Sequence, residues 1–171
     1  TIEVVTASQV EAFAAQALDE AAADPGAVVP ISRSRARAWA ANPQAGPDEP
    51  VLLVARLEGR CVGYLGMFPT LLATAEPGET GTVSWLSAFF VLEELRGQAV
   101  GALLLMQALS LGRSLAVAGP AEEAAALYAA VGFKPKELTY LRLDVTRERN
   151  WLGLPLRTVR KTLQKAERPV P

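Results

Sequence analysis

The chain of 171 residues contains no histidine, and Cys61 is its only cysteine. Without histidine, neither Ser-His-Asp catalysis nor a histidine-bound metal site can form, and one cysteine cannot build a zinc cluster. A disulfide within the chain is also excluded, so a cytoplasmic setting is the expectation. We therefore expect chemistry that depends on neither a metal nor an imidazole.

The chain also lacks a strong net charge and a long apolar run. Its formal net charge is -1, so no overall attraction draws it to nucleic acid or to an anionic membrane. No stretch reaches the ~18 uninterrupted apolar residues of a membrane-spanning helix. Half of the residues are apolar and a fifth are charged, which is typical of a globular domain with one core.

Two helices are expected early in the chain, each with its own start signal. Ser8 and Glu11 fit a capping box, in which their side chains satisfy backbone amides at the start of a helix that runs to about residue 23. Ser32 is expected to cap a second, arginine-rich helix that ends before Asn42.

Apolar runs bounded by turn residues predict the strands of the chain. These runs lie at residues 2–5, 51–57, 61–68, 82–92, 114–118 and 137–145. Two further helices separate the last three strands, and Gly132 is expected to end the second of them. The order β-α-α-β-β-β-α-β-α-β predicts an α/β (α+β) fold, a mixed sheet with helices on its faces. The basic tail at 146–171 is expected to be an amphipathic helix or a linker.

The join between the fourth strand and the next helix is the most informative stretch. Arg96 and Gly97 stand at this join, after a strand that ends near Leu92. The first turn of a helix leaves amide protons unpaired, and glycine allows a phosphate to approach the backbone closely. The stretch matches neither a nucleotide P-loop nor the GxGxxG fingerprint. A simple tight turn and an anion site both remain open from these residues alone.

The same stretch resembles the acyl-CoA-binding motif of the GCN5-related N-acetyltransferase (GNAT) family, Arg/Gln-x-x-Gly-x-Gly/Ala. Arg96 matches the first position and Gly101 the last, while Ala99 stands where the family has glycine. A second match follows at the expected separation, where Tyr128 precedes a Gly-Phe pair at 132–133. The resemblance implies a mostly antiparallel central sheet and an acyltransferase domain at residues 1–145.

The resemblance also implies a site for acetyl-CoA as co-substrate. Backbone amides after Arg96 would hold the pyrophosphate, and the end of the fourth strand would pair with pantetheine. In helical geometry alanine is unstrained, so Ala99 is expected to permit binding. Tyr128 would donate a proton to the departing thiolate. The residues implied for acetyl-CoA binding are Phe89, Phe90, Val91, Arg96, Gly97, Gln98, Ala99, Val100, Gly101 and Ala102.

A base and an acceptor are harder to identify. The fourth strand carries Ser84 and Ser87 but no carboxylate, and Glu76 and Glu79 in the preceding loop could reach the acceptor. No base is assigned. The arginines of the second helix are either a solvated face or a site for an anionic acceptor. These arginines are Arg33, Arg35 and Arg37.

Two classes of function follow from these observations. The first is an N-acetyltransferase that moves an acetyl group from acetyl-CoA to a primary amine, on a small molecule or a peptide. The second is a non-catalytic module of acetyltransferase type that binds acyl-CoA or supports a neighbouring domain. Neither class calls for nucleic acid or a metal, and homodimerisation is left open.

Overall fold

The structure is a computed structural model that describes residues 1–73, 80–135, 140–149 and 155–164, the last two ranges as backbone. The chain divides into two compact units, Thr1–Val131 and Gly132–Pro171. The first unit holds every residue that the sequence proposes for acetyl-CoA and is described first.

A five-stranded sheet forms the centre of the first unit. Its strands follow one another in chain order, and every neighbouring pair is antiparallel except β4 and β5, which are parallel. The predicted mixed, mostly antiparallel sheet is therefore confirmed. The strands are β1 (Ile2–Thr6), β2 (Pro50–Leu57), β3 (Arg60–Ala73), β4 (Thr80–Val91) and β5 (Ser114–Val117).

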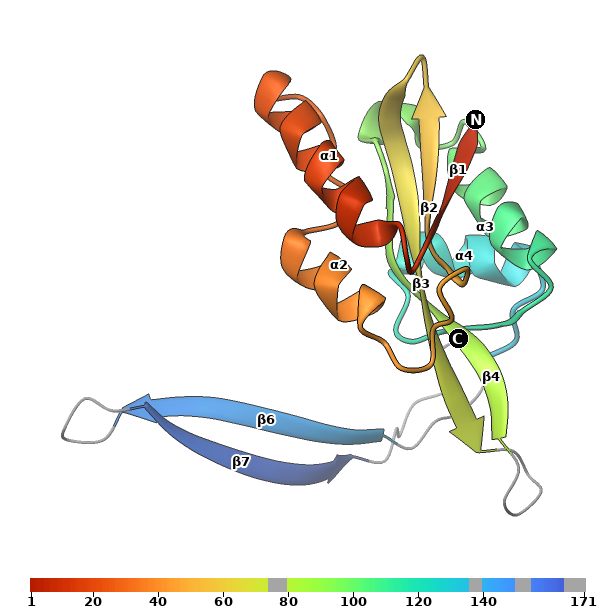
Figure 1. Cartoon of the computed structure of the whole chain (residues 1–171). Coiled ribbons are helices and arrows are strands. Elements are labelled where there is room, and N and C mark those ends of the chain that lie inside the picture. Colours follow the sequence, from red (N-terminus) through yellow and green to blue (C-terminus); the bar gives the residue numbers. More distant parts are fainter. Residues whose placement is uncertain (74–79, 136–139, 150–154, 165–171) are drawn as a thin grey trace. The chain divides into compact units, whose positions relative to one another are not determined.

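Helices cover both faces of this sheet (Figure 1). Helices α1 and α2 lie on one face, and α3 and α4 lie on the other. A short 3-10 helix, η1, separates β4 from α3. The order of elements agrees with the order predicted from the sequence. The helices are α1 (Val10–Ala23), α2 (Arg33–Ala40), η1 (Glu93–Leu95), α3 (Val100–Ser110) and α4 (Glu122–Ala130).

Of the two N-terminal caps predicted for the first two helices, the structure contains one. Ser32 caps α2 as predicted, because its hydroxyl accepts a hydrogen bond from the Arg35 amide at 3.3 Å. The capping box at the start of α1 is wrong. That helix begins at Val10, and Gln9 at its N-cap position makes no side-chain cap. Instead the Gln9 side chain accepts a hydrogen bond from the Thr6 amide at 3.1 Å. This contact joins the end of β1 to the helix start.

The main core lies between the sheet and the pair α1 and α2. Apolar positions of α1 recur at three- and four-residue spacing, so one stripe of the helix faces the strands. Trp39 of α2 is part of this core and is 7% exposed. The core positions include Val5, Val10, Phe13, Ala14, Ala17, Ile31, Ala36, Val51, Leu52 and Val54.

The second unit contains a two-stranded antiparallel sheet. Its strands are β6 (Tyr140–Arg149) and β7 (Pro155–Gln164), which pair along their whole length. The helix expected in the basic tail is therefore wrong, because its centre is strand. Valine and threonine at 158–159 and 162 favour extended backbone and a hairpin partner is available. The predicted domain boundary after residue 145 stays a prediction.

Candidate functional site

Strand β4 loses one of its two neighbours before it ends. Its pairing with β5 runs from Val83 to Leu86, whereas its pairing with β3 continues to Val91. A β-bulge lies just beyond the last residue that pairs with β5. Between two successive cross-strand pairs, β4 has two residues whereas β3 has only one. Ala88 in this bulge has a positive φ of 51°. Residues 87–91 thus have no β5 partner, as expected for a strand end that could pair with a ligand.

The turn after η1 presents a row of backbone amides. The first bond of α3 is donated by Leu103 to the Ala99 carbonyl at 2.9 Å. Among the described residues, five amides of this turn have no hydrogen-bond acceptor. Positive φ values of 80° at Gly97 and 64° at Ala99 alternate with ordinary backbone, which is the geometry of an anion-binding concavity. The five amides belong to Gly97, Ala99, Val100, Gly101 and Ala102.

Ala99 corrects one expectation. It is the N-cap residue of α3 in the left-handed conformation, with φ 64° and ψ 0°, and not a residue of the helix itself. Alanine in this conformation is strained, because its Cβ approaches the following carbonyl oxygen. The family motif has glycine at this position, and glycine carries no such strain. The backbone of the turn therefore keeps the conformation that glycine favours, although the residue is alanine.

Phe89 joins the strand end to both helices of its face. An added Cβ at Gly101 would lie 3.0 Å from Cζ of Phe89 and 3.3 Å from Cδ2 of Leu127. The Phe89 and Tyr128 ring centroids are 6.0 Å apart. The first turn of α3, the end of β4 and α4 therefore meet at one place. Gly101 serves this close packing, a role that the motif alone does not reveal.

Tyr128 lies on the buried side of α4 and is only 5% exposed. Burial raises the pKa of its phenol, because the charged form loses hydration. The hydroxyl is therefore a proton donor over the whole physiological range. Gly132 has a φ of 97° just after α4, as expected for a left-handed helix cap.

Arg96 lies exposed beside the amide row. Its Nε donates to the Val91 carbonyl across 3.4 Å, which is a long hydrogen bond. The neighbouring Gln98 donates from Nε2 to the Glu94 carbonyl at 3.0 Å, across the turn. The cation of Arg96 is thus held between the strand end and the helix start, where an anionic group could reach it.

The opposite face of β4 looks toward α2. Tyr64 and Phe90 are cross-strand partners whose rings stack with centroids 5.2 Å apart. Ser87 is exposed on this face, whereas Ser84 is completely buried. Of the two β4 serines that the sequence offers, Ser87 is therefore the one that an acceptor could reach. No motif in the sequence points to Tyr64, although its place on the strand before the fourth strand was a usable signal.

No base emerges from the described residues. Glu76 and Glu79, which the sequence offered as candidates, lie outside the part of the chain that the structure describes. Cys61 is half-buried, and burial raises the pKa of its thiol. Within the described ranges, no cluster of three or more acidic, cysteine or histidine side chains could hold a metal ion. Among the helices that the structure describes, none has the length and apolarity needed to cross a membrane.

Solved structures with the same fold include several acetyltransferases. A mutant of the BH1408 protein from Bacillus halodurans is 15% identical with a TM-score of 0.54, over 82% of this chain and 96% of that one. The aminoglycoside N-acetyltransferase AAC(6')-Iy in complex with CoA is 17% identical with a TM-score of 0.52, over 88% and 95% of the two chains. A predicted acetyltransferase with acetyl-CoA from Clostridium acetobutylicum is 12% identical with a TM-score of 0.53, over 84% and 95%.

The similarity to these solved structures shows the fold, and a match to a family model shows the family. Curated protein sequences yielded no match. The model of the acetyltransferase (GNAT) family matches residues 15–133, a span that contains the end of β4, the amide row and Tyr128. The chain therefore belongs to the acetyltransferase (GNAT) family.

Proposed function

We propose that the chain is an acetyl-CoA-dependent N-acetyltransferase that acts on a primary amine. One observation carries the proposal: Phe89, in the β4 segment without a β5 partner, packs against both the first turn of α3 and the ring of Tyr128. A ligand held there would have its phosphates at the amides and its reactive end beside the phenol. The likeness to a CoA complex and to a complex with acetyl-CoA supports this choice of ligand.

The amide row suits the pyrophosphate of CoA. Five amides without acceptors in the described residues converge at the positive end of the α3 dipole. Arg96 adds a fixed positive charge at the edge of the row. The residues proposed for this part are Arg96, Gly97, Gln98, Ala99, Val100, Gly101 and Ala102, with the Gln98 amide already donating to the Leu95 carbonyl at 3.2 Å.

The strand end suits pantetheine, which carries amide groups of its own. Phe89, Phe90 and Val91 belong to the β4 segment that has no β5 partner, so their backbone can pair with an added strand. The Val91 carbonyl, which accepts a long hydrogen bond from Arg96, would instead accept a hydrogen bond from an amide of the ligand. A backbone amide beside the bulge would then be available to polarise the thioester carbonyl.

Acetyl-CoA supplies an activated acetyl group: the amine nitrogen bonds to the carbonyl carbon, the C–S bond breaks, and the sulfur leaves as a thiolate. Tyr128 is the proposed proton donor to that thiolate, since its phenol stays protonated at neutral pH. The amine gives up its own proton to water, because the described part of β4 offers no carboxylate. An acceptor that is partly neutral at the working pH is therefore required.

A non-catalytic module that binds acyl-CoA is the second candidate. The strain at Ala99 and the lack of a carboxylate on β4 favour it, because both depart from what efficient acetyl transfer uses. The two candidates share one ligand and differ in chemistry. Binding of CoA alone therefore does not separate them.

Tyr128→Phe separates the two candidates. The change removes one oxygen and keeps the ring that contacts Phe89. If Tyr128 donates the proton, the maximal rate should fall by ~10²-fold with the CoA affinity unchanged. Thiol release measures the rate, and calorimetry measures the affinity. Full activity of the variant would refute the role of Tyr128, and a wild-type protein that binds CoA but transfers no acetyl group to any amine would favour the module.

The same pair of proteins tests the pKa of Tyr128. Because burial raises that pKa, the unfolded chain loses the phenolic proton at a lower pH than the folded chain. The wild type should therefore lose stability as the pH rises above about 10, where a free phenol ionises. The Tyr128→Phe variant should lose less stability than the wild type over this pH range. If urea unfolding shows equal losses of stability for both proteins at each pH, the phenol is not shielded from water.

A further inference from the structure

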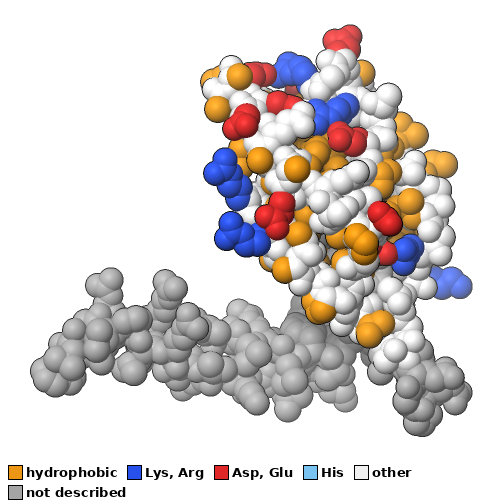
Figure 2. Space-filling model, in the orientation of Figure 1, with side chains coloured by type: hydrophobic (Ala, Val, Ile, Leu, Met, Phe, Trp, Pro, Cys, Tyr) orange, Lys and Arg blue, Asp and Glu red, His pale blue; other side chains and the backbone are white. Residues whose placement is uncertain are grey.

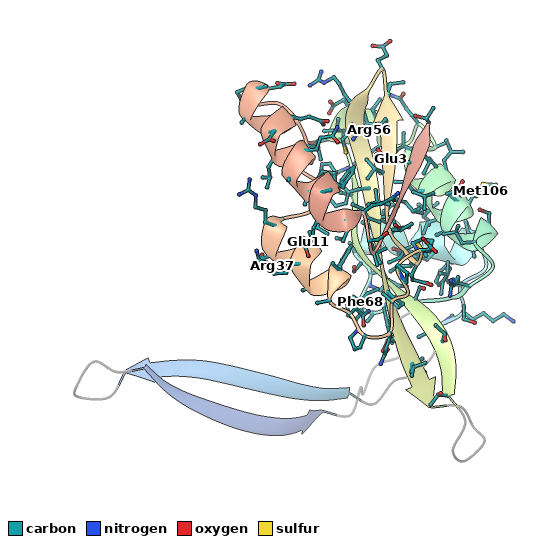
Figure 3. All side chains as sticks on the ribbon, viewed as in Figure 1. Glu3, Glu11, Arg37, Arg56, Phe68 and Met106 are labelled. Carbon is teal, nitrogen blue, oxygen red and sulfur yellow. The ribbon has the colours of Figure 1, made fainter. Side chains whose placement is uncertain are left out.

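The face of the β3–β4 hairpin that looks toward α2 is rich in aromatic side chains. Directly opposite residues of paired strands share a face. The pairs Tyr64 with Phe90 and Phe68 with Trp85 therefore project to one side. That side is the side of α2, because a Cβ added at Gly66, between Tyr64 and Phe68, would collide with the Trp39 ring. Phe68 is labelled on β3 in Figure 3.

Ser87 of β4 lies next to this aromatic face. The Cβ position of Gly66 lies 2.9 Å from the Ser87 carbonyl oxygen and 3.0 Å from its hydroxyl. Ser87 is exposed and stands directly before the bulge residue Ala88. On the other side of the bulge, Phe89 packs against the α3 and α4 helices. An amine can therefore approach the strand end from the side of α2, along the aromatic residues.

Positive charge borders the same face. Helix α2 carries Arg33, Arg35 and Arg37 and no acidic residue, and basic side chains gather over it in Figure 2. The ion pairs among the described residues involve none of these three arginines. Arg35 stands four residues before Trp39, so the two side chains are neighbours on the helix surface.

Arg35 lies on the side of the aromatic pair. It neighbours Trp39 on α2, and the Trp39 ring packs against Gly66 between Tyr64 and Phe68. Burial and the nearby Cys61 raise the pKa of Tyr64, and the positive charge of Arg35 lowers it. The approach to Ser87 thus combines flat apolar surface with a cation that has no anionic partner in the described residues.

We infer that the acceptor is a primary amine that also carries a carboxylate and a flat apolar group. Arg35 would bind the carboxylate, Tyr64 and Phe90 would contact the apolar group, and the amine would lie beside Ser87. The inference rests on the proposed function and names its substrate class. It also disfavours polycationic amines, because three arginines of α2 would repel them. The reaction joins the acceptor nitrogen to the acetyl carbon and breaks the C–S bond. CoA leaves as a thiol with the proton of Tyr128, the amine passes its proton to water, and the phenolate of Tyr128 takes a proton back from water.

A panel of four amines tests this class. L-Phenylalanine has all three features, phenethylamine lacks the carboxylate, glycine lacks the apolar group, and spermidine is a polycation. Rates are compared per neutral amine, from pH profiles, so that differences in amine pKa do not enter. The kcat/KM for L-phenylalanine should exceed that of each other amine by ~10-fold or more, since a charged contact of this kind contributes about that factor.

Two matched variants locate the contact. Arg35→Gln and Arg33→Gln remove the same charge from the first turn of α2, but only position 35 lies beside Trp39. Arg35→Gln should raise KM for L-phenylalanine by ~10- to 100-fold and leave kcat and the phenethylamine rate nearly unchanged. Arg33→Gln should change KM by less than about twofold, as expected for an exposed charge outside the contact. Binding of N-acetyl-L-phenylalanine to the CoA-bound protein, measured by calorimetry, should show the same order.

The outcomes distinguish this inference from the proposed function. Calorimetry without any heat from CoA or acetyl-CoA would remove the proposed function, and the acceptor class with it. If acetyl-CoA binds but spermidine or phenethylamine is the better acceptor, the acceptor class alone is wrong. Equal effects of the two arginine variants, or no binding of N-acetyl-L-phenylalanine to the CoA-bound protein at millimolar concentration, would also overturn it.

Discussion

Ala99→Gly gives the sharpest test of the turn that would hold the phosphates. Ala99 has φ 64° and ψ 0°, and a left-handed conformation costs an L-residue about 1–2 kcal/mol. Glycine avoids this cost but loses about 0.5–1 kcal/mol more in conformational entropy on folding. The difference predicts that Ala99→Gly stabilises the protein by about 0–1.5 kcal/mol, with a midpoint of about 0.75 kcal/mol. The opposite sign is expected for a position inside the helix, where glycine costs about 1 kcal/mol relative to alanine.

Ala102→Gly is the matched control, because it makes the same change within the first turn of α3. It should destabilise the protein by about 0.5–1 kcal/mol. Urea unfolding followed by circular dichroism measures both free energies. For a chain of this size each kcal/mol shifts Tm by about 2–4 °C, so the two variants should move in opposite directions by an amount that is easily measured.

One result would refute this reasoning. If Ala99→Gly destabilises the protein as much as Ala102→Gly does, position 99 is helical in solution and the amide row has another shape. The proposed function adds a second expectation. Removing the methyl group eases the approach of a phosphate to the backbone, so Ala99→Gly should bind CoA at least as tightly as the wild type.

Two further changes test the packing of the first unit. Gly101→Val should destabilise the protein by about 1–3 kcal/mol in urea unfolding, because its side chain would collide with Phe89 and Leu127, and a neutral result would mean that α3 can shift. Arg113→Gln should cost about 1–3 kcal/mol, because its 2.6 Å ion pair holds Glu49, whose side chain is 11% exposed. Adding Glu49→Gln to Arg113→Gln should restore part of that loss, and a double variant less stable than the single one would contradict this explanation.

The order of helices and strands could be predicted, because each of these elements depends mainly on residues that are close to one another in the sequence. The Ser32 cap and the glycine after α4 are local features with local causes. The amide row at Arg96 could be anticipated from its motif for the same reason. The tail at 155–164 was misread because its apolar residues recur every three or four positions, which suits a helix, whereas pairing with another strand makes this segment a strand.

Other features required the tertiary structure. The left-handed conformation of Ala99 is one of them, because no property of alanine favours it. The meeting of Phe89, Gly101 and Tyr128 joins three separate elements.

The sequence by itself determined the main helices and strands of the first unit, their order and the candidate phosphate turn, because hydrophobic period and turn residues act over a few positions. Tertiary structure decided which side chains meet at the strand end. The bulge at Ala88 puts Phe90, and not Phe89, on the face of Ser87 and leaves Phe89 packed against α3. One extra residue in β4 therefore decides which phenylalanine faces the side proposed for acetyl-CoA and which faces the side proposed for the acceptor. A bulge of this kind is set by the pairing of β4 with β3, and residue spacing along a single strand does not reveal it.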